Sequence, residues 1–137
     1  MTLASRLCGH LVTGHVDSVG TVVKCIPEGR SIRFGIKVPD KLVRYISRKG
    51  SICVDGVSLT VNTVTGTQFE VQVIPHTLAR TTFADYSIGQ IVNVEVDIIA
   101  RYVEQLLRAD PEGFLCGRGI TWERLTRHGF TPAGSQP

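Results

Sequence analysis

The chain has 137 residues, of which 42% are hydrophobic and 20% are charged, and its formal net charge is +3 at pH 7. This length and composition predict one domain with an apolar core and exclude a chain that is disordered beyond its ends. The basic residues are scattered, which argues against a nucleic-acid-binding surface, and no apolar run is long enough to predict a membrane span.

Four cysteines, Cys8, Cys25, Cys53 and Cys116, lie far apart and lack the spacing of metal ligands. Cys25 and Cys53 fall inside apolar strand patterns, as small core residues of a protein in a reducing compartment do. The sequence shows no basic-then-apolar leader for export. We therefore expect a cytoplasmic protein without a bound metal.

In chain order, short strands separated by turn signals dominate the first hundred residues. We expect strands at residues 16–26, 31–38, 51–54, 57–64, 69–74 and 91–96. The first should contain Gly20 as a β-bulge and end at Pro27, and Asp55-Gly56 should join the third and fourth in a tight hairpin. Short helices are predicted at residues 39–46 and near residues 78–83. Six antiparallel strands of this length predict an all-β fold, a small six-stranded closed barrel with short connecting helices.

The strand at residues 57–64 has an informative pattern of side chains. Ser58, Thr60 and Asn62 alternate with three aliphatic residues. Side chains change face at each residue of a strand, so one face is apolar and the other carries hydrogen-bonding groups. Short hydroxyls and an amide, in place of charges, suit a neutral, oxygen-rich small molecule.

After residue 97 the hydrophobic period becomes that of a helix. Asp97 is placed to cap this helix. A second short helix is predicted at residues 122–128, and the tail after Phe130 is expected to fray. The first helix has an apolar stripe that is wider than one barrel flank needs and indicates a surface for association, formed by Ile98, Ile99, Tyr102, Val103, Leu106 and Leu107.

Four motifs in register give the chain a specific resemblance. It is similar, from about His10 to Phe130, to the second barrel of riboflavin synthase. The motifs are Gly14-His15-Val16-Asp17, then Lys49-Gly50-Ser51 and the strand pair as far as Asn62, then Ile74-Pro75-His76-Thr77-Leu78, and finally Val94-Glu95-Val96-Asp97 with Ala100-Arg101-Tyr102-Val103-Glu104.

The resemblance implies an activity and an assembly. The family's full-length enzyme has two similar barrels in tandem and a C-terminal helix, and it forms a trimer. It dismutates two molecules of 6,7-dimethyl-8-ribityllumazine by four-carbon transfer, giving riboflavin and 5-amino-6-ribitylaminopyrimidinedione. It uses neither a metal nor an organic cofactor, and we expect none here.

The chain departs from the family pattern because the first barrel is absent. Residues 4–13 resemble the junction that would follow that barrel. We therefore expect a linker-like segment at 1–13, a lumazine-binding barrel at 14–97, C-terminal helices at 98–130 and a flexible tail at 131–137. In the family each active site lies between the first barrel of one subunit and the second barrel of another. This chain is thus expected to hold half of a site and to form a homo-oligomer, with a symmetric dimer as the alternative to the trimer.

The resemblance also implies which residues act. His15, Ser58 and Asp97 are the implied catalytic residues, and the competing structural interpretations are a turn for His15, a solvated strand residue for Ser58 and a helix cap for Asp97. His10 and the imidazole of His76 are interpreted as structural. The implied substrate-binding residues are Gly14, His15, Val16, Lys49, Ser58, Leu59 through its backbone, Thr60, Ile74, Pro75, His76, Thr77, Leu78 and Ala79.

Two hypotheses for function from different classes remain, together with a third, less specific one. The first is the C-terminal portion of a riboflavin synthase, and the second is a non-catalytic lumazine- or flavin-binding protein of the same barrel family. His15, Ser58 and Asp97 together favour the enzyme. The third is a barrel that binds another ligand, which the four motifs in register argue against.

Overall fold

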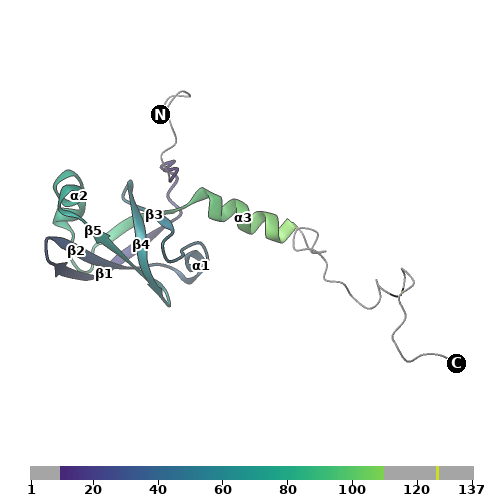
Figure 1. Ribbon diagram of the computed structural model, residues 1–137, viewed down its shortest axis with the longest axis horizontal. Coiled ribbons are helices and arrows are strands. Elements are labelled where there is room, and N and C mark those ends of the chain that lie inside the picture. Colours follow the sequence, from purple (N-terminus) through teal and green to yellow (C-terminus); the bar gives the residue numbers. More distant parts are fainter. Residues whose placement is uncertain (1–9, 110–125, 127–137) are drawn as a thin grey trace, which may run out of the picture. The chain divides into compact units, whose positions relative to one another are not determined.

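The computed structural model describes residues 10–109 and residue 126. Six strands close into a barrel in the order β1-β2-β5-β4-β3-β6, and every neighbouring pair is antiparallel (Figure 1). The predicted fold class is therefore confirmed. The strands are β1 (Ser18–Glu28), β2 (Ser31–Lys37), β3 (Ser51–Val54), β4 (Val57–Thr65), β5 (Gln68–Val73) and β6 (Ile91–Val96), and the helices are α1 (Asp40–Val43), α2 (Pro75–Arg80), the 3-10 helix η1 (Thr82–Asp85) and α3 (Ile98–Ala109).

The core forms because alternate residues of each strand point into the barrel. Phe34, Ile52, Val61 and Phe69 are fully buried, each on a different strand. Phe83 from η1 packs edge-on against Phe34, with ring centroids 5.3 Å apart. Apolar side chains from the strands and from η1 therefore form one continuous core.

Two details of β1 correct the sequence prediction. The register with β2 shifts between Val22 and Lys24, so the bulge is not at Gly20. Gly20 is needed for close packing, since a Cβ there would lie 2.8 Å from Cγ2 of Ile36. The strand also continues through Pro27, which lies beyond the residues that pair with β6. Proline is tolerated there because that part of β1 is a sheet edge on one side.

The predicted hairpin at Asp55-Gly56 is confirmed. Both residues have positive φ, 44° and 83°, as a two-residue turn of type I′ requires. The carboxylate of Asp55 accepts hydrogen bonds from the Tyr86 hydroxyl and, at 2.7 Å, from the Asn93 backbone. Burial and the hydrogen bond to Asp55 raise the pKa of Tyr86 to about 12. The turn is thus tied to β6 and to the segment after η1.

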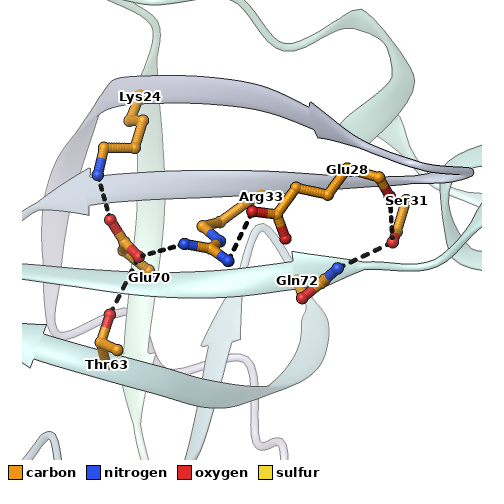
Figure 2. Close-up of polar contacts among 7 residues, drawn as sticks. All are labelled: Lys24, Glu28, Ser31, Arg33, Thr63, Glu70 and Gln72. Carbon is orange, nitrogen blue, oxygen red and sulfur yellow. Dashed lines mark hydrogen bonds and ion pairs between the residues drawn. The ribbon is translucent and has the colours of Figure 1, made fainter.

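A charged cluster connects four strands on the outside of the barrel (Figure 2). Glu70 of β5 accepts hydrogen bonds from Lys24 of β1 and, at 3.1 Å, from Thr63 of β4. Arg33 of β2 lies 3.7 Å from Glu70 and 2.6 Å from Glu28 of β1. The hydrogen bond from Lys24 outweighs burial and lowers the pKa of Glu70.

The chain divides after Arg101 into two compact units. Helix α3 begins as predicted, because the Asp97 carboxylate accepts a hydrogen bond of 3.0 Å from the Ile99 backbone. Among the described residues no helix is long and apolar enough to cross a membrane. The predicted helix at 122–128 and the tail, most of the linker-like segment, Cys8 and Cys116 fall outside the described residues. The predicted role of the apolar stripe stays a prediction.

Candidate ligand-binding site

The polar face predicted for β4 is present. Ser58, Thr60 and Asn62 are exposed, while Val61 between them is fully buried. Leu59 is partly buried and packs against the core. The alternation therefore gives an outer surface of short neutral side chains above an apolar layer.

The backbone of this part of β4 is also open to one side. Residues 57–60 pair with β3, whereas the ladder with β5 begins only at Val61. Val61 exchanges backbone hydrogen bonds with the β3 side, from its N–H to Gly50 at 2.9 Å and from Lys49 to its carbonyl at 2.8 Å. Successive residues of a strand direct these groups to opposite sides, so those of Ser58 and Thr60 point away from β3. The backbone groups of Ser58 and Thr60 therefore face the side on which β5 does not pair with this part of β4.

The strand predicted as far as Ile74 ends one residue earlier, and a helix starts sooner than the one predicted near residues 78–83. β5 ends at Val73, and α2 starts at Pro75, where proline's missing N–H is not needed. The Ile74 carbonyl accepts a hydrogen bond of 3.0 Å from Leu78, so this group is already partnered. Side chains at Ile74, Pro75, His76 and Ala79 are exposed, whereas Thr77 and Leu78 are partly buried. Because β4 and β5 are antiparallel with Val61 opposite Val71, the end of β5 runs toward the same end of the barrel as Ser58.

A cavity of about 200 Å³ lies where the chain enters β1 and leaves β6. Of the predicted site residues only His15 lines it. Gly14 precedes it with a φ of 81°, a conformation that favours glycine. The lining residues are Thr13, His15, Asp17, Glu95, Val96, Ile98 and Arg101.

Glu95 is a buried carboxylate that the sequence prediction missed as a site residue. It is 4% exposed and accepts hydrogen bonds from the Thr13 backbone and hydroxyl, both at 2.7 Å, and from the Gly14 backbone at 3.1 Å. Burial alone would raise the pKa of Glu95, but the hydrogen bonds from Thr13 and Gly14 outweigh burial and lower it. Glu95 thus holds the segment before β1 against β6 as an ionised group.

Asp17 and Arg101 form a second anchor on the same side. Asp17 accepts a hydrogen bond of 2.7 Å from the Val96 backbone and pairs with Arg101 at the start of α3. The Arg101 guanidinium also lies 5.1 Å from the centre of the Tyr45 ring. Asp17 and Arg101 both line the cavity, so these contacts fix part of its lining.

His10, which the sequence analysis interprets as structural, contacts a predicted site residue. Its Nδ1 lies 2.9 Å from Oγ of Ser58, and its Nε2 is buried without a hydrogen-bond partner among the described residues. Ser58, Cys53 and Glu95 lie opposite one another across β4, β3 and β6. Since His10 contacts one end of this row and Thr13 the other, residues 10–14 cross over Cys53.

This crossing changes the interpretation of Cys53. The thiol is buried as predicted, at 2% exposure, but it alternates with Ile52 and Val54, which point into the core. The thiol of Cys53 therefore lies on the outer face of the barrel, where residues 10–14 cover it. Burial and the nearby Glu95 raise the pKa of Cys53, which makes it a poor nucleophile.

Only some of the predicted catalytic and substrate-binding residues lie close together in the structure. Ser58, Leu59 and Thr60 lie together on β4, and Gly14, His15 and Val16 form the approach to β1. Within residues 10–109 no direct hydrogen bond joins His15, Ser58 and Asp97. The Asp97 carboxylate caps α3, and the exposed Lys49 has a φ of 66°. The catalytic and binding roles of all these residues stay predictions.

Comparison with known proteins places these features in a family. Residues 13–97 match the lumazine binding domain. The chain is 47% identical over 130 residues to a riboflavin synthase of Photobacterium phosphoreum, covering 95% of this chain and 59% of that protein. It is 46% identical over 110 residues to a riboflavin synthase of Photobacterium leiognathi, covering 80% of this chain and 50% of that one. The chain thus spans between half and three fifths of the length of these curated relatives.

A solved structure supports the same relationship. The barrel resembles LumP in its complex with 6,7-dimethyl-8-(1'-D-ribityl) lumazine, with a TM-score of 0.59 and 26% sequence identity. The match covers 64% of this chain and 49% of LumP.

Proposed function

The chain belongs to the family of lumazine-binding domains, and on that premise we propose that it is the C-terminal portion of a riboflavin synthase. In this proposal the barrel binds one 6,7-dimethyl-8-ribityllumazine molecule, and a second barrel binds the other substrate molecule. Four-carbon transfer between the two gives riboflavin and 5-amino-6-ribitylaminopyrimidinedione. The protein acts in the cytoplasm as a homo-oligomer and requires no metal or organic cofactor.

The observation that carries the proposal is the outer face of β4. Ser58 and Thr60 present hydroxyls to solvent. Their backbone groups face the side on which this part of β4 is not paired with β5. A flat heterocycle with carbonyl oxygens, ring nitrogens and a polyhydroxylated chain needs such a mixture of donors and acceptors. Identity of 47% to a riboflavin synthase over 95% of this chain supports the same ligand here.

The chemistry makes modest demands on the protein. A proton is removed from a ring methyl group of one substrate, and the carbanion is delocalised into the heterocycle. Holding two rings in reacting contact contributes up to about 7–11 kcal/mol to lowering the barrier. His15, which lines the cavity, and Asp97, immediately after β6, are the proposed groups for proton transfer.

The second candidate is a carrier that binds a lumazine without transforming it. The resemblance to LumP in complex with a lumazine favours it, because that structure shares the barrel and not only a sequence motif. Identity of 47% to a riboflavin synthase, against 26% to LumP, makes the enzyme the better supported function.

A binding and turnover experiment tests the proposal. The chain is titrated into 6,7-dimethyl-8-ribityllumazine and, separately, riboflavin, and ligand fluorescence is followed. Riboflavin formation is then measured for the chain alone and with an added first barrel from a relative. We expect binding by the chain alone and turnover that depends on the added barrel. Binding without turnover in either mixture would favour the carrier, and no binding by folded protein at millimolar concentration would contradict both.

Variants of the proton-transfer groups sharpen the test. Asp97→Asn keeps the helix cap, because asparagine caps about as well as aspartate. We expect His15→Ala and Asp97→Asn each to slow turnover by more than tenfold while leaving lumazine affinity within about threefold. Turnover within a factor of two of the unchanged protein for both variants would remove the catalytic role assigned to these residues.

A further inference from the structure

The contact between His10 and Ser58 has a chemical consequence for the ligand face. The two side chains come from residues 48 positions apart, and Nδ1 of His10 lies 2.9 Å from Oγ of Ser58. This is an ordinary hydrogen-bond distance. A neutral imidazole donates from one nitrogen and accepts at the other, so the direction of the bond depends on which nitrogen carries the proton.

The surroundings of the ring favour one direction. Nε2 of His10 is buried and has no hydrogen-bond partner among residues 10–109 and 126, the part of the chain that the structure describes. If Nε2 carried the proton, a buried N–H would lack an acceptor, which proteins avoid more strictly than an unpartnered acceptor atom. The proton therefore belongs on Nδ1, where it can be donated to Oγ of Ser58.

From this we infer that His10 is a positioning residue, which donates to the Ser58 hydroxyl and so directs its proton toward the bound ligand. A hydroxyl oxygen that accepts from a fixed donor has its own O–H left for another acceptor. Ser58 is exposed, so its O–H is accessible to a ligand, and the acceptor in this inference is a carbonyl oxygen or ring nitrogen of that ligand. The inference rests on the proposed function and adds to it the residue that orients Ser58.

The anchoring of the segment supports this role. Three residues after His10, the Thr13 backbone and hydroxyl and then the Gly14 backbone are bound by the buried carboxylate of Glu95. These bonds hold the segment against β6, so His10 reaches Ser58 from a fixed backbone. A side chain positioned in this way loses little conformational entropy when it orients its partner.

The test uses two substitutions that place an amide at different distances from the backbone. His10→Asn puts its amide at the δ position, where Nδ1 lies, whereas His10→Gln puts it one bond farther. Riboflavin and 6,7-dimethyl-8-ribityllumazine serve as probes of the full chain in fluorescence titrations. We expect His10→Ala and His10→Gln to weaken lumazine binding by about 3- to 10-fold, and His10→Asn to stay within about twofold. Thr65→Ala, at the exposed far end of β4, is the matched control and should bind like the unchanged protein.

A double-mutant cycle shows whether His10 acts through Ser58. In a Ser58→Ala background, His10→Ala should cause no further loss of affinity. An equal loss in both backgrounds, or failure of His10→Asn to bind better than His10→Gln, would overturn the inference. If His10→Ala does not fold, the comparison of the asparagine and glutamine variants still decides.

A measurement on the free protein separates this inference from the proposed function. Long-range proton–nitrogen NMR spectra of the imidazole should show the proton of His10 on Nδ1. A proton on Nε2 would overturn the inference even if the ligand binds. If the unchanged protein binds neither probe, the proposed function fails, and the positioning role with it. If it binds and Ser58→Ala weakens binding while the His10 variants do not, only the inference fails.

Discussion

Two glutamates on the outside of the barrel, Glu70 and Glu95, are stabilised in contrasting ways. Glu70 is surrounded by full charges, with Lys24 and Arg33 beside it (Figure 2). Glu95 is bound by backbone N–H groups and a hydroxyl, from Thr13 and Gly14. Both carboxyl groups have a pKa lowered against the effect of burial, by the hydrogen bond from Lys24 at Glu70 and by the hydrogen bonds from Thr13 and Gly14 at Glu95.

The two glutamates lie on faces of the barrel with different roles. The face around Glu70 connects strands, whereas the face around Ser58 is suited to a neutral ligand. The cluster around Glu70 connects β1, β2 and β5 through charged side chains and reaches β4 through the Thr63 hydroxyl. On the Ser58 side the charge of Glu95 is covered by residues 13–14, and the exposed groups are hydroxyls. A neutral ribityl heterocycle can bind there without displacing a charged partner.

The largest effect on stability should come from Glu95. In Glu95→Ala, the donors at Thr13 and Gly14 lose their acceptor, and we expect the free energy of unfolding to fall by about 2–3 kcal/mol. Hydrogen exchange at the Thr13 and Gly14 amides should accelerate more than exchange in β2. Urea unfolding checks the first expectation and NMR-detected exchange the second. An unchanged exchange rate at these amides would show that Glu95 does not anchor the segment.

Protonation of Glu70 and Glu95 in acid should lower the free energy of unfolding by less than Glu95→Ala does. A lowered pKa in the folded state means that each glutamate stabilises the fold above its ordinary pKa. This contribution is lost as the pH falls through the lowered value. Protonation leaves an acceptor oxygen in place, so the loss is less than that of Glu95→Ala. Unfolding measured from pH 6 to pH 2 should show a flatter pH dependence in Glu70→Gln and in Glu95→Gln, and a slope unaltered in both would contradict the assignments.

The smallest effect should come from the charged cluster. Lys24 is partly exposed, so Lys24→Met should lower stability by only about 0.5–1 kcal/mol. This difference should shrink in 1 M NaCl, because salt screens exposed charges, whereas the effect of Glu95→Ala should persist. Unfolding curves at both salt concentrations provide the comparison. If salt weakened the Glu95 effect as much as the Lys24 effect, the contrast between the two faces would not hold.

The sequence predicted those parts of the molecule that depend on local pattern. The alternation around Ser58, the Asp55-Gly56 turn and the Asp97 cap are each set by a few neighbouring residues, and all three are present. The bulge was misplaced, because the need for Gly20 arises from Ile36 on another strand.

What the sequence could not predict depends on contacts between distant segments. Glu95 looks like an outward polar residue of a strand, and nothing near it indicates that residues 13–14 cover it. The same holds for the contact of His10 with Ser58, 48 residues away. The one available signal was a carboxylate between Val94 and Val96 in a strand otherwise rich in valine.

The most direct test of the central claim is a map of the ligand on the barrel. Backbone amide shifts of the full chain are recorded by NMR while 6,7-dimethyl-8-ribityllumazine is added. The largest changes are expected at Ser58, Leu59 and Thr60 and at the end of β5 near Ile74, with little change at Lys24 and Glu70. Changes centred on the Lys24 and Glu70 face, or no changes at saturating ligand, would contradict the claim that the open edge of β4 binds the ligand.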